Sequence, residues 1–118
     1  MDKREYPRYD KDLQVDYAYQ QKVPTTEEHG RILNISLGGI YMLSGSILEK
    51  GMEITLTFTI NKNNKMTTLT TTGSVLRSGK ISDEPEMSQK YDIKAPENRC
   101  FAVIKFNAPF IELSFMLH

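Results

Sequence analysis

The chain has few of the residues on which most catalytic and metal sites depend. Its 118 residues include one cysteine, two histidines and no tryptophan. Cys100 excludes an internal disulfide, fits a reducing compartment and, at the head of an apolar run, is expected to be buried. Neither His29 nor His118 has partners at metal-ligand spacing or beside a nucleophile. With no Walker loop or dinucleotide fingerprint, the sequence predicts neither an enzyme nor a cofactor.

The chain also lacks net charge and long apolar stretches. Fifteen Lys and Arg balance fifteen Asp and Glu, which argues against nucleic acid as the main partner. No apolar run approaches the length of about 20 residues that a membrane span needs, and the charged N-terminus lacks a signal-peptide core. We therefore expect a cytoplasmic protein without membrane insertion. The length and the 39% hydrophobic content indicate a single domain over residues 1–118.

Alternating apolar and polar residues predict a β protein. The clearest strand is 52–60, where Ile54, Leu56 and Phe58 face one way and threonines the other. Because threonine supplies little core, one face of the hairpin formed with 66–77 should be exposed. Further strands are expected at 13–19, 30–34, 39–43 and 100–106. About six antiparallel strands with little helical periodicity indicate a small barrel or sandwich.

The segments between these strands are polar. Connections are expected at 20–30, 44–51 and 61–65. Residues 78–98, which contain Pro85 and Pro96, predict a long polar loop. Gly73 is a candidate bulge or sharp bend within its strand. Residues 109–118 fit either a short helix begun by a proline or a strand, and both alternatives stay open.

A polar corner with the pattern Asn34-x-Ser36-x-x-Gly39 lies between two of the expected strands. Asparagine and serine side chains can bond nearby backbone or a ligand. Gly38 and Gly39 permit a positive φ or the close approach of another group. Taken alone, the corner fits best a hairpin-like turn whose Asn34 and Ser36 satisfy their own backbone.

Two arginines precede the first expected strand, Arg4 and Arg8, with Pro7 between them. The proline disfavours a helix, so the segment is expected to be extended. Each guanidinium offers a rigid fork of donors that matches a phosphate and can also stack on a flat base. Taken alone, the segment fits a solvated basic tail.

Together, the two blocks resemble the bipartite signature of the PilZ domain family. Arg4-x-x-x-Arg8 is followed by 25 residues and then by Asn34-x-Ser36-x-x-Gly39. The resemblance covers roughly residues 3–106 and narrows the expected fold to a six-stranded antiparallel Greek-key barrel with a short C-terminal helix as an option. It implies a receptor or adaptor that binds cyclic di-GMP, changes conformation and signals to an effector protein supplied in trans.

The resemblance also implies roles for individual residues. Arg4 and Arg8 would contact the phosphates and the Hoogsteen edge or face of guanine. Asn34 and Ser36 would hydrogen-bond guanine or phosphate, and Gly39 would leave room for the base. Asn34 stands where many members of the family have Asp and contributes no negative charge.

Three further expectations concern the surroundings of this site. In the family, a basic residue at the position of Lys3 tends to accompany a stacked pair of ligand molecules. Arg31 and Arg77 could flank the site, although exposed strand charges are the default interpretation. Residues 1–10 are predicted to form a flexible arm that closes over the ligand, because they have little apolar surface to bury.

Two other functions fit a barrel of this size. The first is a PilZ-like protein-interaction module that does not bind nucleotide; the presence of both arginines and the complete second block argues against it. The second is an oligonucleotide-binding barrel, which should interleave aromatics with Lys or Arg on a strand face. Here the strand aromatics are predicted to lie on the apolar side of the alternation.

Overall fold

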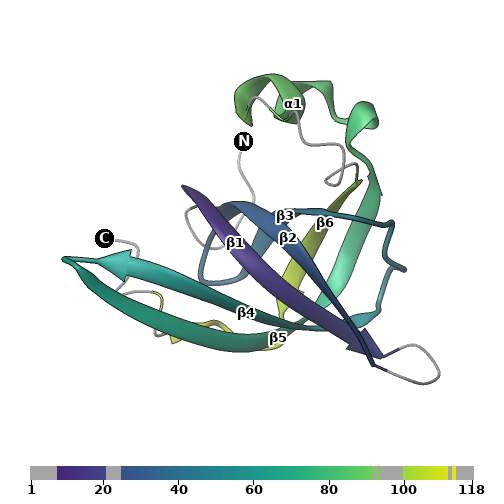
Figure 1. The fold of residues 1–118 in the computed structure, drawn as a ribbon. Coiled ribbons are helices and arrows are strands. Elements are labelled where there is room, and N and C mark those ends of the chain that lie inside the picture. Colours follow the sequence, from purple (N-terminus) through teal and green to yellow (C-terminus); the bar gives the residue numbers. More distant parts are fainter. Residues whose placement is uncertain (1–7, 21–24, 92, 94–99, 112, 114–118) are drawn as a thin grey trace.

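The computed structural model describes residues 8–20, 25–91, 93, 100–111 and 113 (Figure 1). Within these ranges, six strands pair antiparallel into a closed barrel in the order β1-β2-β3-β6-β5-β4. The chain therefore crosses from β3 to β4, and β6 is inserted between β3 and β5. This confirms the predicted six-stranded antiparallel barrel. The elements are β1 (Tyr9–Gln20), β2 (Thr25–Ile35), β3 (Gly39–Ser44), β4 (Glu53–Lys62), β5 (Lys65–Lys80), the 3-10 helix η1 (Ile81–Asp83), α1 (Pro85–Tyr91) and β6 (Cys100–Phe106).

The barrel interior is filled by the apolar side of the alternation. Along β4, the buried residues are those predicted from the sequence, and on β1 the side chains of Val15, Tyr17 and Tyr19 are also buried. Cys100 is buried as expected. Beyond β6, Phe110 packs its ring edgewise against Phe106, with the ring centroids 5.9 Å apart. The interior core thus extends past the last strand, where the described residues form a short turn of 3-10 helix rather than a strand.

The hairpin between β4 and β5 follows the prediction closely. Asn63 and Asn64 have positive φ values of 55° and 64°, as a tight hairpin turn matching the strand twist requires. The outward threonines form exposed cross-strand pairs; for example, the hydroxyls of Thr59 and Thr68 are 2.9 Å apart. The expectation of one exposed face is therefore confirmed. In Figure 1 this hairpin projects from the barrel on the side away from the β3–β4 connection.

Three irregularities in strand register change the direction in which side chains point. They lie between Asp10 and Leu13 in β1, between Ile32 and Asn34 in β2, and between Val75 and Arg77 in β5. An extra residue on one strand reverses the inside–outside alternation that follows it. Consequently, Asn34 and Arg77 point to the outer face although Ile32 and Val75, two positions earlier, are core residues.

The irregularity of β5 does not lie at Gly73, the candidate bulge. A Cβ at Gly73 would stand 2.6 Å from the carbonyl oxygen of Lys105. This glycine therefore serves the close approach of β5 and β6.

Two predictions about segments outside the strands, at 20–30 and at 1–10, are wrong in part. The polar segment 20–30 contains the start of β2, which begins at Thr25. Its acidic residue Glu28 accepts hydrogen bonds from the hydroxyls of Tyr17 and Tyr19 at 2.6 and 3.0 Å, so a polar side chain occupies a site where alternation calls for an apolar one. The flexible arm predicted over residues 1–10 is wrong for Tyr9 and Asp10, which lie in β1. Residues 1–7 lie outside the described ranges.

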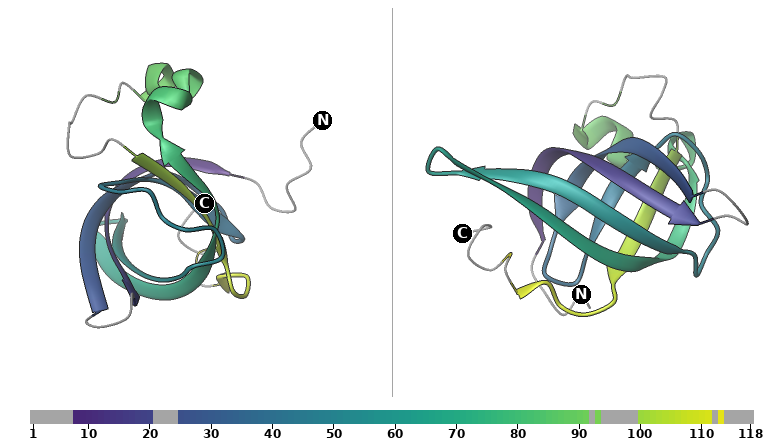
Figure 2. Two further views of the ribbon diagram at one scale, coloured as in Figure 1. Left: turned by 90° about the vertical axis from the view of Figure 1, so that its right-hand side faces the viewer. Right: turned by 60° about the horizontal axis from the view of Figure 1, so that its bottom comes forward.

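The predicted loop at 78–98 is the larger correction. Strand β5 continues to Lys80, and η1 and α1 follow it. Pro85 starts α1 because its fixed φ suits the first helical position, and Glu86 and Lys90 lie at the ends that the helix dipole favours. Residues 94–99 lie outside the described ranges. Figure 2 shows α1 outside the barrel wall.

A second apolar cluster lies on this outer wall, separate from the barrel interior. Its buried members come from β2, β3 and β6, and residues of η1, α1 and the segment after α1 pack against them. The cluster comprises Leu33, Tyr41, Leu43, Phe101 and Val103, with Ile81, Met87, Tyr91 and Ile93 packed on it. The wall formed by β2, β3 and β6 is therefore covered on both faces.

Candidate functional site

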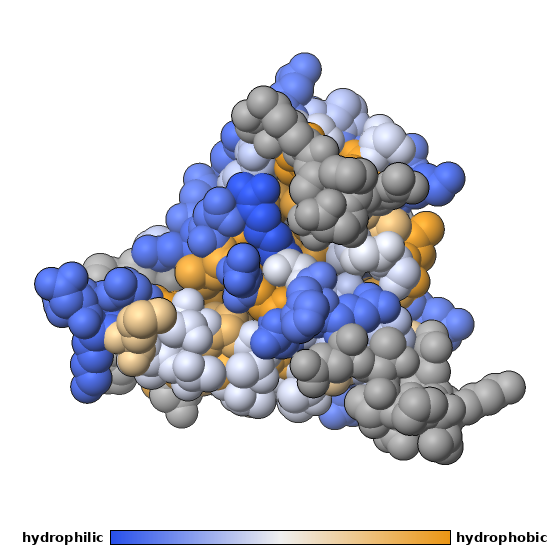
Figure 3. Space-filling model, in the orientation of Figure 1, coloured by the Kyte–Doolittle hydropathy of each residue, from blue (hydrophilic) through white to orange (hydrophobic). Residues whose placement is uncertain are grey.

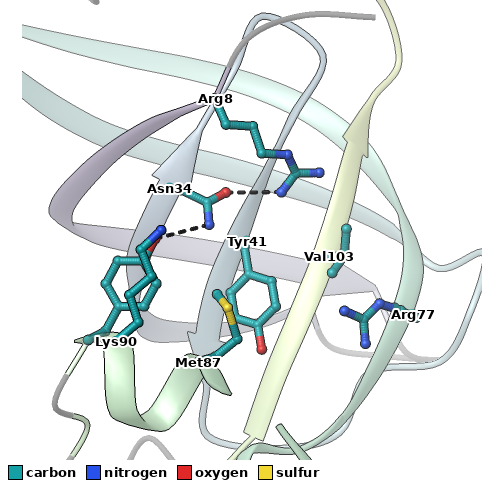
Figure 4. Close-up of a pocket in the computed structure, with 8 residues that line it drawn as sticks. Arg8, Asn34, Tyr41, Arg77, Met87, Lys90 and Val103 are labelled. Carbon is teal, nitrogen blue, oxygen red and sulfur yellow. Dashed lines mark hydrogen bonds between the residues drawn. The ribbon is translucent and has the colours of Figure 1, made fainter. Parts of the chain in front are cut away.

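A cavity of about 320 Å³ lies beside this outer cluster, between the barrel wall and α1. Figure 3 shows hydrophilic side chains around apolar surface on the face seen in Figure 1. Cationic, aromatic, amide and apolar side chains converge on the cavity from the residue before β1, from β2, β3, β5 and β6, and from α1 (Figure 4). The lining residues are Arg8, Asn34, Tyr41, Arg77, Met87, Lys90, Tyr91 and Val103.

Asn34 and Arg8 join the two halves of the sequence motif. Arg8 Nη1 donates a hydrogen bond to Asn34 Oδ1 at 3.0 Å, and the two side chains point toward each other in Figure 4. Asn34 also donates from Nδ2 to the hydroxyl of Tyr91, a long contact of 3.5 Å. Through these two hydrogen bonds, the Asn34 amide links Arg8 to α1. Asn34 itself is buried, with 7% of its surface exposed.

The C-terminal end of α1 is attached to β1 through Asp10. The Tyr91 hydroxyl donates to Asp10 Oδ1 at 2.5 Å, and Lys90 Nζ lies 3.6 Å from the same oxygen. The hydrogen bond from Tyr91 is the main cause that lowers the pKa of Asp10, and Lys90 adds to it. The neighbouring tyrosine, followed by Asp10, raises the pKa of Lys90. Asp10 therefore attracts the ammonium group of Lys90, which lines the cavity, and would compete for it with an anionic ligand.

The N-terminal end of α1 is attached to the barrel wall through Glu84, the residue that precedes the helix. Arg77 Nη1 lies 2.8 Å from Glu84 Oε1, and the Tyr41 hydroxyl donates to the same oxygen at 3.4 Å. Burial is the first cause that raises the pKa of Tyr41, followed by the charge of Glu84. The Tyr41 ring is stacked on Phe101, with centroids 5.4 Å apart and planes within 2° of parallel. Flat rings and cations around one cavity suit a ligand that is both planar and anionic.

Ser36 and Gly39 do not line the cavity; they shape the corner that carries Asn34. The Ser36 hydroxyl accepts hydrogen bonds from the backbone N–H groups of Gly38 and Gly39 at 3.1 and 3.2 Å. The Ser36 N–H donates to the Gly39 carbonyl at 2.9 Å. A Cβ at Gly39 would collide with the carbonyl of Ile104 on β6. Both residues thus satisfy a local backbone requirement, and ligand contacts from them stay a prediction.

Of the two arginines expected as possible flanking residues, Arg31 and Arg77, only Arg77 lines the cavity. Arg31 donates from Nε and Nη2 to the carboxylate of Asp12 at 2.6 and 2.9 Å and does not line the cavity. Arg77 does line it. Arg4 and Lys3 lie outside the described residues.

The sequence predicted none of the lining residues that β3, β6 and α1 contribute. The expectation that strand aromatics lie on the interior side is wrong for Tyr41 and Phe101, which belong to the outer cluster. A signal was present, because 39–43 and 100–104 are nearly continuous apolar runs, typical of strands buried on both faces. Met87 and Tyr91 stand four residues apart, the spacing of one helical face.

The described ranges contain no group of three or more His, Cys, Asp or Glu that could hold a metal ion. None of the helices described is long and apolar enough to cross a membrane.

The fold and the cavity define a small β-barrel binding domain with cations and aromatic rings gathered on its outer wall. The model of the PilZ domain family matches residues 2–100, and the chain belongs to that family. PilZ domains are typically binding and adaptor modules rather than catalysts.

A similar solved structure is that of the Bacillus subtilis inhibitor of motility (MotI/DgrA). It superposes with a TM-score of 0.69 at 18% sequence identity, over 99% of this chain and 49% of that one. The chain thus spans about half the length of that structure, and the likeness supports the fold. Among curated proteins, none matches the sequence.

Proposed function

We propose that this domain is a receptor for cyclic di-GMP that changes conformation when the ligand binds and signals to a partner protein. The observation that carries the proposal is the contact between Arg8 and Asn34 on the wall of the cavity. These residues come from the two separate blocks of the PilZ motif. Their meeting beside a cationic and aromatic cavity is what a bipartite ligand site requires.

Cyclic di-GMP presents two phosphates and two guanines, which call for cationic forks, flat partners and groups that read a base edge. Arg8, together with Arg4, supplies the forks, which can bind phosphate or the Hoogsteen edge of guanine. Tyr41 and Tyr91 supply rings at the cavity. The Asn34 amide offers both a donor and an acceptor to a guanine edge, while Ser36 and Gly39 hold its corner in place.

Ligand binding requires the site to rearrange. The cavity volume of about 320 Å³ is near the lower end of small-molecule pockets, about 300–1,000 Å³. A dinucleotide is a large ligand for such a space, and its phosphate competes with Asn34 for the Arg8 guanidinium. Movement of the N-terminal segment and of α1 enlarges the site and changes the surface offered to an effector protein. We place this signalling in the cytoplasm, where PilZ proteins generally act.

Isothermal titration calorimetry with cyclic di-GMP tests the proposal, with cyclic AMP and GTP as controls for selectivity. We expect saturable binding to cyclic di-GMP alone, with an affinity that falls as salt concentration rises. A stoichiometry of two ligand molecules per chain would support the role proposed for Lys3. A flat trace with all three nucleotides would favour the protein-interaction module. Competition by single-stranded DNA would favour the oligonucleotide-binding barrel.

A further inference from the structure

Arg77 reaches the cavity only because of the irregular register of β5. Val75 pairs with Ile104 in the barrel interior, and after one extra residue Arg77 pairs with Val103. The extra residue, Leu76, is 48% exposed. If the alternation of β5 were regular, Arg77, two positions after Val75, would point into the apolar core. Bulges that redirect a side chain are common beside functional sites, and this one places a guanidinium at the cavity.

The aromatic surface beneath Arg77 holds its guanidinium along the wall. The guanidinium carbon lies 4.9 Å from the centroid of the Phe101 ring, which itself stacks on Tyr41. Because the Phe101 ring offers no hydrogen-bond acceptor, this cation–π contact leaves the planar donor fork of Arg77 available to an anion. The Arg77 side chain remains 57% exposed, so a solute can reach it.

The carboxylate of Glu84 occupies this fork. Glu84 Oε1 lies 2.8 Å from Arg77 Nη1, and the glutamate side chain is only 21% exposed. Glu84 also begins α1, because its carbonyl accepts hydrogen bonds from the N–H groups of Met87 and Ser88, both at 3.1 Å. One residue therefore provides both the anion bound to Arg77 and the start of the helix over the cavity.

We propose, resting on the function proposed above, that Arg77 is a third cationic contact for a ligand phosphate and that Glu84 holds its place in the unliganded protein. A phosphate and a carboxylate match the same guanidinium fork, so the ligand exchanges with Glu84 rather than binding beside it. The released Glu84 no longer ties the start of α1 to β5. The exchange thus links phosphate recognition to the detachment of the helix.

Calorimetry with cyclic di-GMP on Arg77→Ala, Glu84→Gln and the double variant tests the exchange. The Arg31–Asp12 ion pair offers matched controls, Arg31→Ala and Asp12→Asn, since it lies outside the cavity lining. We expect Arg77→Ala to weaken binding by about tenfold or more, the scale of one charge-assisted hydrogen bond. Glu84→Gln should tighten binding by about threefold, as a competing charge is removed. In the Arg77→Ala background, that gain should disappear.

Each outcome of this experiment is decisive. If Arg77→Ala and Glu84→Gln behave like the two controls while the wild type binds, the inference is wrong and the proposed function stands. A gain from Glu84→Gln that persists without Arg77 shows general electrostatics and also overturns the exchange. If Arg77→Ala fails to fold, Arg77→Lys replaces it, keeping the charge but not the fork; unchanged affinity in that variant and in Glu84→Gln overturns the inference. A flat wild-type titration overturns the proposed function and the inference together.

Discussion

Replacing Ser36 by alanine removes the acceptor that holds the corner between β2 and β3. Its hydroxyl accepts from the N–H groups of Gly38 and Gly39 at 3.1 and 3.2 Å. Ser36 is 6% exposed and Gly39 is also buried, so water cannot readily replace the lost acceptor. The variant therefore leaves backbone donors unsatisfied in the folded state but not in the unfolded one.

The size of the effect follows from these two bonds. An ordinary hydrogen bond contributes about 0.5–1.5 kcal/mol, and a buried donor left without a partner costs about 1–3 kcal/mol. Gly39 is buried and Gly38 is half-buried, so we expect Ser36→Ala to lower the free energy of unfolding by about 1.5–3 kcal/mol. For a domain of this length, that corresponds to a fall in Tm of about 5–15 °C.

Urea unfolding followed by circular dichroism measures this loss. Ser82→Ala is the matched control, because Ser82 is an exposed serine in η1. A loss for Ser36→Ala within about 0.5 kcal/mol of the control would refute the structural role, since surface substitutions fall in that range. A variant of unchanged stability that binds cyclic di-GMP more weakly would instead assign Ser36 to the ligand.

Three further predictions follow from other contacts. Gly39→Ala should destabilise the barrel by about 1–3 kcal/mol in urea unfolding, because the new Cβ meets the Ile104 carbonyl; unchanged stability would show that β3 and β6 can separate freely. The raised pKa of Tyr41 means that its hydroxyl ionises first in the unfolded chain, so the stability it contributes is complete below pH 10.0 and is lost as pH rises toward the folded pKa. Tyr41→Phe should therefore lose less stability than the wild type between pH 8 and about 10.5, and equal losses would contradict this account. Tyr91→Phe should speed amide hydrogen exchange in α1 by removing the bonds to Asp10 and Asn34, whereas unchanged exchange would mean that apolar packing alone holds the helix.

Most of the barrel was predictable because its strands obey a simple physical alternation. The residues of β4 face a core on one side and solvent on the other, so polarity and position coincide. The prediction failed where tertiary contacts change that rule. At the start of β2, Glu28 is paired with two tyrosines, so a polar residue no longer indicates solvent. In β5, the extra residue Leu76 interrupts the alternation, so the pattern did not predict that the strand continues to Lys80.

The site was predictable only in its local part. The motif identified Arg8 and Asn34, which do meet at the cavity. The spacing of a motif carries no information about what packs on it from distant parts of the chain. Helix α1 has no buried residue and only 7 residues, so its sequence resembles that of a polar loop. Lys90 and Tyr91 reach the cavity because that helix docks on the outer cluster.

The most direct test of a cyclic di-GMP site at this cavity is a titration of the isotope-labelled protein, followed by amide chemical shifts. We predict that the largest changes on adding cyclic di-GMP occur at Arg8, Asn34, Tyr41 and residues 85–91, which line or carry the cavity. Asn64, at the far turn of the β4–β5 hairpin, should not respond. An unchanged spectrum, or changes confined to that hairpin, would contradict the account.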